Sequence, residues 1–345
     1  MEKLNVAVVG LGMGRHHVRC FKNCPEANVV ALCDADPTRL NNAGDEFGVK
    51  QRFTQTEELF AMKDLHAVSI ALPNFLHAPV TIAALKAGLH VMCEKPLAMN
   101  AQEAEQMVAA AKAADRQLMV HFNTRYQEPS RWARQIVDAG VVGPIYFGRT
   151  GWHRSRGIPG GLGGWFTTKS KAGGGPLIDL GVHRLDLALW LMDYPEPVAV
   201  SGAAYSELGK ELAARKGKEF DVEDMAAGFI RFANGATLVL EASWATNTGK
   251  REDGFTTLLG TKGGLHLYNE NQGYEFSGRA YQEIGGQLVE IAPKQPLPPL
   301  TAQDAFVRAI LAGEPVPAPG EQGLQVMRIL DALYKSAEEG REIRL

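Results

Sequence analysis

An acid, a lysine and a proline stand where an apolar strand is predicted to end. The run His90–Cys93 reads as a short buried strand, and Glu94, Lys95 and Pro96 follow it directly. Proline fixes the backbone φ angle, so it restrains the position of the lysine that precedes it. A carboxylate beside a restrained ammonium group can orient a ligand or assist proton transfer.

A second set of polar residues forms a stripe on a predicted apolar helix over residues 177–191. Asp179, His183 and Asp186 follow i, i+4 and i+7 spacing. Because unpaired buried polar groups cost free energy, this stripe must face polar partners or a wet cavity. One alternative is a structural core histidine hydrogen-bonded to Asp179. A metal site is a poorer interpretation, because one helix offers two ligands and no clear third.

The N-terminal segment predicts a strand, a glycine turn and a helix that starts at about Met13. The turn contains Gly10, Gly12 and Gly14, and the next apolar strand ends on Asp34. This order is the pattern of a dinucleotide-binding unit, in which the pyrophosphate binds at the helix N-terminus. The alternative is a glycine turn in a parallel sheet that binds no ligand.

The acid at the end of the second strand bears on the choice of cofactor. Asp34 can accept hydrogen bonds from ribose hydroxyls and repels a 2′-phosphate, which favours NAD, whereas the nearby Arg39 keeps NADP possible. Arg15 occupies the usual third glycine position, so we expect it to contact the phosphates.

Strands and helices then alternate as far as residue 123, which predicts a doubly wound parallel sheet in a Rossmann domain over residues 1–123. Ligands of such sheets gather at the carboxyl ends of the strands. The polar or conformationally special residues expected at these ends are Pro73, Asn74, His77, Glu94, Lys95, Pro96, Asn123 and Arg125.

Residues 124–345 are predicted to form a second, α+β domain with an open, mostly antiparallel sheet, because successive apolar runs are separated by short turns. The glycine-rich stretch 157–175 and the strand before it supply Arg154, Arg156, Trp165 and Lys169, side chains suited to hydroxylated or anionic ligands. A surface loop without a ligand is the alternative. We expect the sheet to assemble the chain into a homodimer or homotetramer.

Composition excludes several classes of function. The chain has 345 residues, a formal net charge of −3 and 45% hydrophobic residues, so a basic nucleic-acid-binding surface is not expected. No apolar run is long enough to span a membrane, and no signal peptide is recognised, so a cytoplasmic location is expected. The four cysteines lack the spacing of a zinc or redox site and are expected to be small buried residues.

Three blocks resemble the glucose-fructose oxidoreductase, inositol dehydrogenase and MocA family, in the order found there. They are "VVGLGMG", "LPNFLHAPVTIAALKAGLHVMCEKPLA" and "GGGPLIDLGVHRLDLALWLM". The resemblance extends over essentially the whole chain. It implies a Rossmann domain, a domain with an open sheet, and NAD(P)-dependent oxidation or reduction at a carbon of a sugar, polyol or related compound, without a metal.

The resemblance also implies roles for individual residues. Lys95, Asp179 and His183 match the family's catalytic group. The expected cofactor contacts are Gly10, Gly12, Met13, Gly14, Arg15, Asp34, Arg39, Leu72, Pro73, Asn74, His77, Glu94, Lys95 and Asn123, and the expected substrate contacts are Lys95, Arg154, Ser155, Trp165, Lys169, Asp179 and His183. Inositol dehydrogenases tend to carry H-R-N where this chain has His153, Arg154 and Ser155, which argues against inositol as the substrate.

In the expected mechanism His183 is the base, Asp179 holds its other ring nitrogen, and Lys95 stabilises the developing alkoxide. Two other functions are compatible with the same residues. One is an NAD-dependent glycosidase that oxidises its sugar transiently, and the other is a non-catalytic sensor of NAD and sugar. Retention of all three residues argues against the sensor.

Overall fold

The computed structural model describes residues 3–345, which divide into two compact units. The first contains the chain up to Phe122 together with Leu300–Met327, and the second contains Asn123–Pro299 and Arg328–Leu345. The boundary after Phe122 lies one residue from the predicted one. The sequence did not indicate that residues 300–327 group with the first unit.

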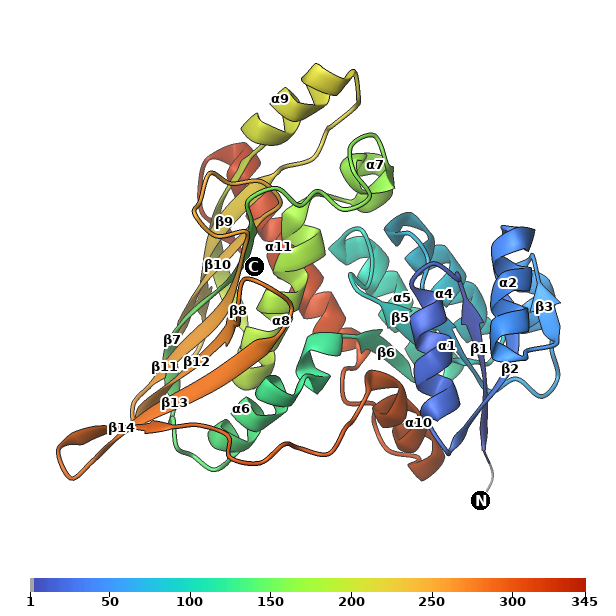
Figure 1. Cartoon of the computed structure of the whole chain (residues 1–345), viewed down its shortest axis with the longest axis horizontal. Coiled ribbons are helices and arrows are strands. Elements are labelled where there is room, and N and C mark those ends of the chain that lie inside the picture. The colour runs from blue at the N-terminus through green and yellow to red at the C-terminus, as the bar shows by residue number, and fades with distance from the viewer. Residues whose placement is uncertain (1–2) are drawn as a thin grey trace. The chain divides into compact units, whose positions relative to one another are not determined.

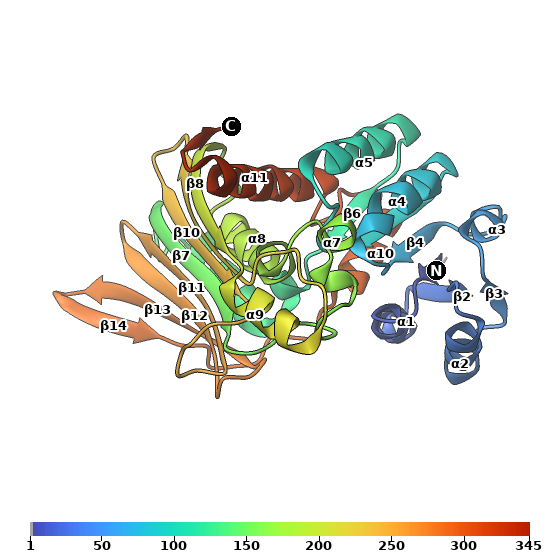
Figure 2. The same cartoon turned by 90° about the horizontal axis from the view of Figure 1, so that it is seen from above.

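The first unit is a parallel six-stranded sheet with helices on both faces. Its strands are β1 (Leu4–Val9), β2 (Ala27–Cys33), β3 (Gln51–Phe53), β4 (Ala67–Ile70), β5 (His90–Glu94) and β6 (Leu118–His121), in the spatial order β3-β2-β1-β4-β5-β6. Its helices are α1 (Gly14–Asn23), α2 (Pro37–Phe47), α3 (Thr56–Phe60), α4 (His77–Lys86), α5 (Ala101–Ala114) and α10 (Ala302–Ala312), with a 3-10 turn η1 (Asn74–Leu76) before α4. Figure 2 shows α4 and α5 on one face and α1 on the other.

The predicted doubly wound sheet is thus confirmed. The central strands β1 and β4 are apolar except for Asn5 and Ser69 and are almost entirely buried, as expected of parallel strands covered by helices on both faces. The short strand β3 was not predicted, because its three residues include a single apolar side chain.

The second unit contains a nine-stranded sheet, whose strands β7 to β14 are coloured from green to orange in Figure 1. Its strands are β7 (Ile145–Arg154), β8 (Pro197–Tyr205), β9 (Met225–Phe232), β10 (Thr237–Ser243), β11 (Glu252–Gly260), β12 (Gly263–Asn269), β13 (Phe276–Ile284), β14 (Gln287–Ile291) and β15 (Ile343–Arg344), in the order β14-β13-β12-β11-β7-β10-β9-β8-β15. Every pairing is antiparallel except that of β7 with β10. The predicted open, mostly antiparallel sheet is therefore confirmed.

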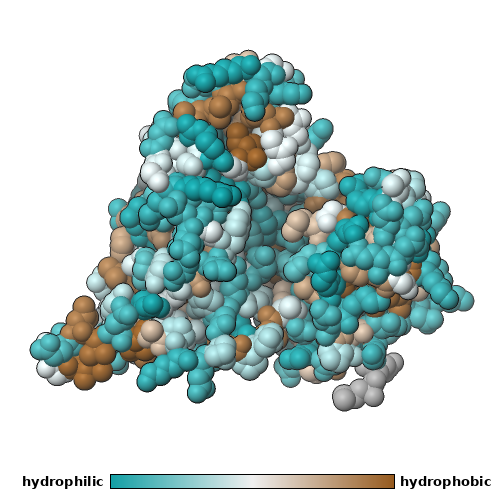
Figure 3. Space-filling model, viewed as in Figure 1, coloured by the Kyte–Doolittle hydropathy of each residue, from teal (hydrophilic) through white to brown (hydrophobic). Residues whose placement is uncertain are grey.

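Helices cover one face of this sheet. They and the short turns of this part of the chain are η2 (Asn123–Tyr126), α6 (Glu128–Asp138), η3 (Trp165–Thr167), α7 (Lys169–Ala172), η4 (Leu177–Gly181), α8 (Val182–Leu191) and α9 (Glu207–Lys216), and α11 (Gly320–Glu339) runs across the boundary between the units. At the far edge, the β13–β14 hairpin exposes Ile284, Leu288 and Val289. Figure 3 shows these apolar side chains gathered at its tip.

The predicted helix over residues 177–191 has two parts. Its first turn, η4, is a π-helix, and α8 continues from it without interruption. A π-turn inserts one extra residue per turn, so the regular i, i+4, i+7 stripe expected from the sequence does not hold at Asp179. Such turns are frequent at functional sites.

Asp186 of α8 belongs to the core. It is fully buried and accepts hydrogen bonds from Arg125 Nε at 3.0 Å and Arg125 Nη2 at 2.6 Å, while Tyr194 Oη bonds to both side chains. Burial raises the pKa of Asp186, and the adjacent guanidinium opposes that shift. This ion pair joins η2, where the second unit begins, to α8.

Within residues 3–345, no helix is both long and apolar enough to cross a bilayer. Cys20, Cys24, Cys33 and Cys93 are free thiols, and all but Cys20 are buried. This agrees with the interpretation of the cysteines as small buried residues.

Replacing Asp186 should destabilise the second unit. Asp186→Asn leaves the buried Arg125 without a counter-charge, so we expect the free energy of unfolding to fall by about 3 kcal/mol. Urea unfolding measures this change. Asp138→Asn is the matched control, since Asp138 pairs with Arg134 at 2.7 Å but is 63% exposed, and its removal should have an effect of about 0.5 kcal/mol. Equal effects of the two variants would contradict a structural role for the buried pair.

Candidate active site

The glycine loop after β1 leaves its backbone uncovered. Gly10 has a φ of +86°, and a Cβ there would lie 2.4 Å from the carbonyl oxygen of Ala71, so only glycine fits. A Cβ on Gly12 would meet nothing within 4 Å, and Met13 is 66% exposed. No side chain caps the N-terminus of α1, so its first amide groups remain available. This end of α1 therefore fits a pyrophosphate.

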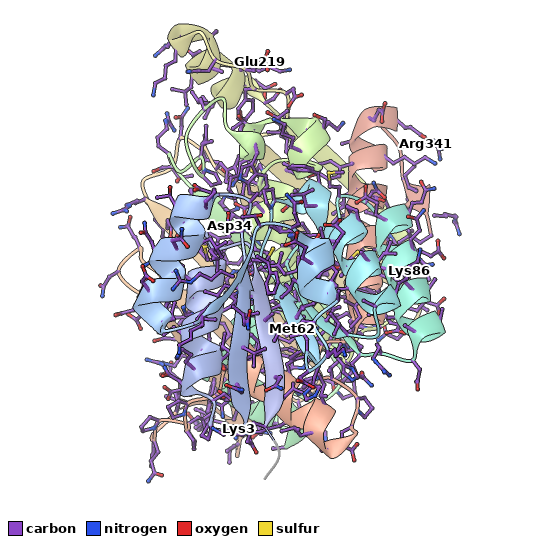
Figure 4. All side chains as sticks on the ribbon, turned by 90° about the vertical axis from the view of Figure 1, so that its right-hand side faces the viewer. Lys3, Asp34, Met62, Lys86, Glu219 and Arg341 are labelled. Atoms are coloured by element: carbon purple, nitrogen blue, oxygen red, sulfur yellow. The ribbon has the colours of Figure 1, made fainter. Side chains whose placement is uncertain are left out.

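Asp34 connects the loop to the end of β2. Its carboxylate accepts hydrogen bonds from the amides of Leu11 at 2.7 Å and Asp36 at 2.9 Å, and from Arg39 Nε at 2.9 Å. In Figure 4 Asp34 lies at the opposite end of the strands from Lys3. It thus lies at the carboxyl edge of the sheet, where a ribose would bind beside the loop.

Arg15, the expected phosphate ligand, forms an ion pair with Glu46 of α2. Its guanidinium would have to leave Glu46 in order to reach a phosphate at the loop. The contact predicted for Arg15 therefore stays a prediction.

His77 connects the ends of β4 and β5. Its Nδ1 lies 2.7 Å from the carbonyl oxygen of Pro96, and its Nε2 lies 2.8 Å from that of Leu72. Burial lowers the pKa of His77, and the two carbonyls oppose this shift. The ring thereby holds the segment with Leu72, Pro73 and Asn74 beside the segment with Lys95 and Pro96.

Glu94 lies in a network that the sequence did not reveal. Its Oε1 is 2.8 Å from His17 Nε2 and 2.9 Å from His121 Nδ1, and its Oε2 accepts the amide of Lys95 at 3.0 Å. Burial alone would raise the pKa of Glu94, yet His121 and His17 hold it well below its usual range. Burial lowers the pKa of His17. In the first unit, His17 therefore connects Ser69 of β4 to Glu94 of β5, and Glu94 in turn contacts His121 of β6.

In the second unit, Asp179 and His183 interrupt an otherwise buried segment. From Pro176 to Leu189 every residue is buried except these two, which are partly exposed. Asp179 Oδ2 accepts a hydrogen bond from Trp244 Nε1 at 3.0 Å. His183 Nδ1 lies 3.3 Å from Thr124 Oγ1. Solvent can thus reach the two side chains that the sequence proposed as reactive, whereas Asp186 of the same stripe is structural.

A buried carboxylate fixes the start of this segment. Glu223 accepts the amides of Gly175 at 2.8 Å and Leu177 at 3.0 Å, and Tyr334 Oη bonds to it at 2.9 Å. Burial raises the pKa of Glu223, while the two amides oppose the shift. The glycine run before η4 is therefore held by an acid 48 residues further along the chain.

Of the predicted substrate contacts, Arg154 lies on the same face of β7 as Trp152, whose ring centroid is 6.3 Å from that of His183. Arg154 Nε bonds to Glu252 at 2.7 Å, and its guanidinium lies over the Trp152 ring. Arg154 therefore lies two positions along β7 from Trp152, the residue whose ring is near that of His183.

The other predicted substrate contacts lie in the segment after β7, in which Trp165 begins η3 and Lys169 begins α7. Ser155 Oγ is 3.5 Å from the carbonyl of Arg251, the Trp165 ring stacks on Phe166 at 3.8 Å, and the Lys169 amide donates to Asp221 at 2.6 Å. Asn123, predicted to contact the cofactor, is exposed at the start of η2. Their ligand roles stay predictions.

Several residues of the site region carried no signal in the sequence. Trp244 belongs to a segment that indicated only β-structure, Glu223 lies just before that segment, and Thr124 lies between two residues expected at a strand end, Asn123 and Arg125. His17 could have been noticed, because it follows the glycine turn on the buried side of α1.

Two family models match the chain. The model described as an oxidoreductase family with an NAD-binding Rossmann fold matches residues 4–122, and the GFO/IDH/MocA C-terminal domain matches residues 130–266. The D-glucoside 3-dehydrogenase of Escherichia coli (strain K12) is 31% identical over 353 residues, which cover 99% of this chain and 97% of the relative.

Two solved structures of oxidoreductases are also similar to this chain. An aldose-aldose oxidoreductase from Caulobacter crescentus, complexed with glycerol, superposes with a TM-score of 0.85 at 30% identity over 100% of both chains. A levoglucosan dehydrogenase in complex with NADH and levoglucosan gives a TM-score of 0.87 at 26% identity over 99% of both chains.

The Glu94 network should make stability depend on pH. The pKa of Glu94 is depressed in the folded protein, so its charge stabilises the fold above the unfolded-chain pKa of about 4.3 and this contribution is lost as pH falls. We expect Glu94→Gln to lower the free energy of unfolding by roughly 1–3 kcal/mol at pH 7. The difference from the wild type should shrink below about pH 4.

Urea unfolding at a series of pH values measures this difference. Glu58→Gln, at an exposed position of α3, is the control and should change little at any pH. A destabilisation by Glu94→Gln that stays constant down to pH 3 would show that the Glu94 charge is not compensated in the folded state.

Proposed function

The chain belongs to the GFO/IDH/MocA family of NAD-binding oxidoreductases, and from this premise we propose that it transfers a hydride between a nicotinamide cofactor and a hydroxyl-bearing carbon of a sugar, with Lys95, Asp179 and His183 as its catalytic group. The assignment of Asp179 and His183 is supported by one observation. From Pro176 to Leu189, Asp179 and His183 are the two partly exposed residues in an otherwise buried helical segment, so a ligand can reach both side chains.

The chemistry assigns a role to each residue. Oxidation of an alcohol requires a base near the hydroxyl, and His183 is suited to this because an imidazole titrates near neutral pH. Trp244 donates a hydrogen bond to Asp179 and so fixes the orientation of its carboxylate. Lys95 stabilises the developing negative charge on the substrate oxygen. The glycine loop, the N-terminus of α1 and Asp34 would hold the dinucleotide, whose nicotinamide would supply the hydride acceptor or donor.

The substrates for which the relatives are named indicate a class of substrate for this chain. Among them are dehydrogenases of D-glucosides, levoglucosan and D-apiose. We therefore expect a secondary hydroxyl on a sugar ring, in a free sugar or a glycoside. The decisive experiment is a panel of sugars, glycosides, polyols and inositols with NAD and NADP, followed at the absorbance of the reduced cofactor. Glycoside cleavage without net NADH would favour the glycosidase, and binding without any turnover would favour the sensor.

Removal of the Lys95 ammonium should lower turnover and leave cofactor binding nearly intact. For Lys95→Ala we expect kcat to fall by about 10²-fold or more, the loss typical of electrostatic or acid–base groups. NADH fluorescence titration should give a Kd close to that of the wild type. Lys86→Ala, at an exposed position of α4, is the control. Near-wild-type turnover of the Lys95 variant would refute the assigned role.

Asp34 should select NAD over NADP. We expect Asp34→Ser to weaken NAD binding and to shift preference toward NADP, because the change removes the ribose acceptor and one of the two carboxylates that pair with Arg39. Titration with both cofactors measures the shift. The additional change Arg39→Ala should abolish the gain in NADP affinity. Unchanged preference in Asp34→Ser would show that Asp34 does not read the ribose.

The nine-stranded sheet is the surface that we propose for self-association into a dimer or tetramer. It exposes Tyr146 on β7, Leu259 on β11 and Leu288 on the edge strand β14, and apolar surface of this kind is often covered by a partner. Light scattering after size-exclusion chromatography gives the molar mass that tests this proposal, and a monomer at micromolar concentration would refute it. The four free thiols accord with a reducing, cytoplasmic location.

A further inference from the structure

We propose that His17 and His121 are positioning residues that act through Glu94 to place Lys95. This inference rests on the catalytic role proposed for Lys95. It concerns side chains of the first unit alone, and neither histidine was among the expected site residues.

The hydrogen-bond pattern holds both rings in place. Glu94 Oε1 lies 2.8 Å from His17 Nε2 and 2.9 Å from His121 Nδ1, so each ring directs one N–H to the carboxylate. The opposite nitrogens have partners of their own. Ser69 Oγ lies 2.7 Å from His17 Nδ1, and Gln303 Nε2 lies 3.2 Å from His121 Nε2. Each ring is therefore fixed from both sides.

This arrangement leaves one oxygen of Glu94 for the main chain of Lys95. With Oε1 held by the two rings, Oε2 is directed to the Lys95 amide at 3.0 Å. The carboxylate cannot rotate without breaking at least two hydrogen bonds in a buried place, which is costly. The backbone from which the Lys95 side chain extends is thereby fixed.

The network also connects Lys95 to the cofactor loop. His17 is part of α1, whose uncapped N-terminus fits the pyrophosphate, and its ring contacts the end of β5 through Glu94. His121 ends β6 and takes its second partner, Gln303, from α10. A displacement of α1 at the phosphates would thus be transmitted to the residue beside Lys95.

A metal ion is the competing interpretation, since two imidazoles and a carboxylate lie within 4.8 Å of one another. Two features argue against it. Both rings approach the same oxygen at 2.8 and 2.9 Å, which are hydrogen-bond distances. The outer nitrogen of His121 faces an amide donor, whereas a metal-bound histidine normally donates from that nitrogen.

The test compares variants that remove the donors with variants that retain them. His17→Leu and His121→Leu remove a donor, whereas His17→Gln and His121→Asn keep an N–H near the original position. His16→Leu, on the exposed side of the same helix, is the control. The measurements are kcat and KM with the sugar oxidised fastest in the substrate panel, Kd for NADH, and thermal unfolding.

We expect the leucine variants to lose kcat by about 10- to 100-fold, as a displaced catalytic group would cause. NADH should still bind with a Kd within a few-fold of the wild type, and the amide-bearing variants should recover most of the turnover. In a Lys95→Ala background the same leucine changes should lower kcat no further, because they act through the missing group. A further loss there would indicate a general structural role and would overturn the proposal.

Two outcomes separate the failure of this inference from the failure of the proposed function. Wild-type turnover of Lys95→Ala removes the proposed function itself. Loss of activity in Lys95→Ala together with wild-type kcat in both leucine variants refutes the inference alone. Elemental analysis of the purified protein provides the remaining check, since a stoichiometric metal ion that is lost in His17→Leu would also overturn it.

Discussion

A buried carboxylate needs hydrogen-bond donors or a counter-charge to replace the water it has lost. This requirement shapes the site regions of both units. Asp186 is fully buried and is compensated by the two hydrogen bonds from Arg125. Because breaking such a pair leaves a buried charge behind, the helix and the segment after β6 keep one arrangement. Thr124, the partner of His183, lies in that segment. An ion pair that performs no chemistry thus holds the surroundings of a proposed base.

Two further acids are held by hydrogen bonds without a guanidinium partner. Glu94 is surrounded by imidazole and amide N–H groups, and Glu223 by two backbone amides and a tyrosine hydroxyl. Each of these acids fixes backbone next to a proposed reactive residue, Lys95 in the first case and Asp179 in the second. Both carboxylates are largely hidden from water. Hydrogen bonds from protein groups therefore determine their orientation.

Local sequence determined most of the first unit, since strand periodicity, glycine turns and helix caps act over a few residues. The sequence also indicated the helix with Asp179 and His183, because polar residues in an otherwise apolar segment must face polar partners or solvent. It could not show which partners they meet. Trp244 contacts Asp179 across 65 residues, and the division of the stripe into a buried Asp186 and an accessible His183 depends on packing. The π-turn and the grouping of residues 300–327 with the first unit have the same long-range origin.

That grouping has a consequence for synthesis on the ribosome. The amide of Val120 in the edge strand β6 donates to the carbonyl of Ala318 at 2.8 Å, and His121 receives its second partner from Gln303. Both partners are translated only after the entire nine-stranded sheet except its last short strand. A nascent chain can therefore form most of the nucleotide fold early, but its outer edge remains open to water and to other strands until nearly the whole polypeptide has emerged.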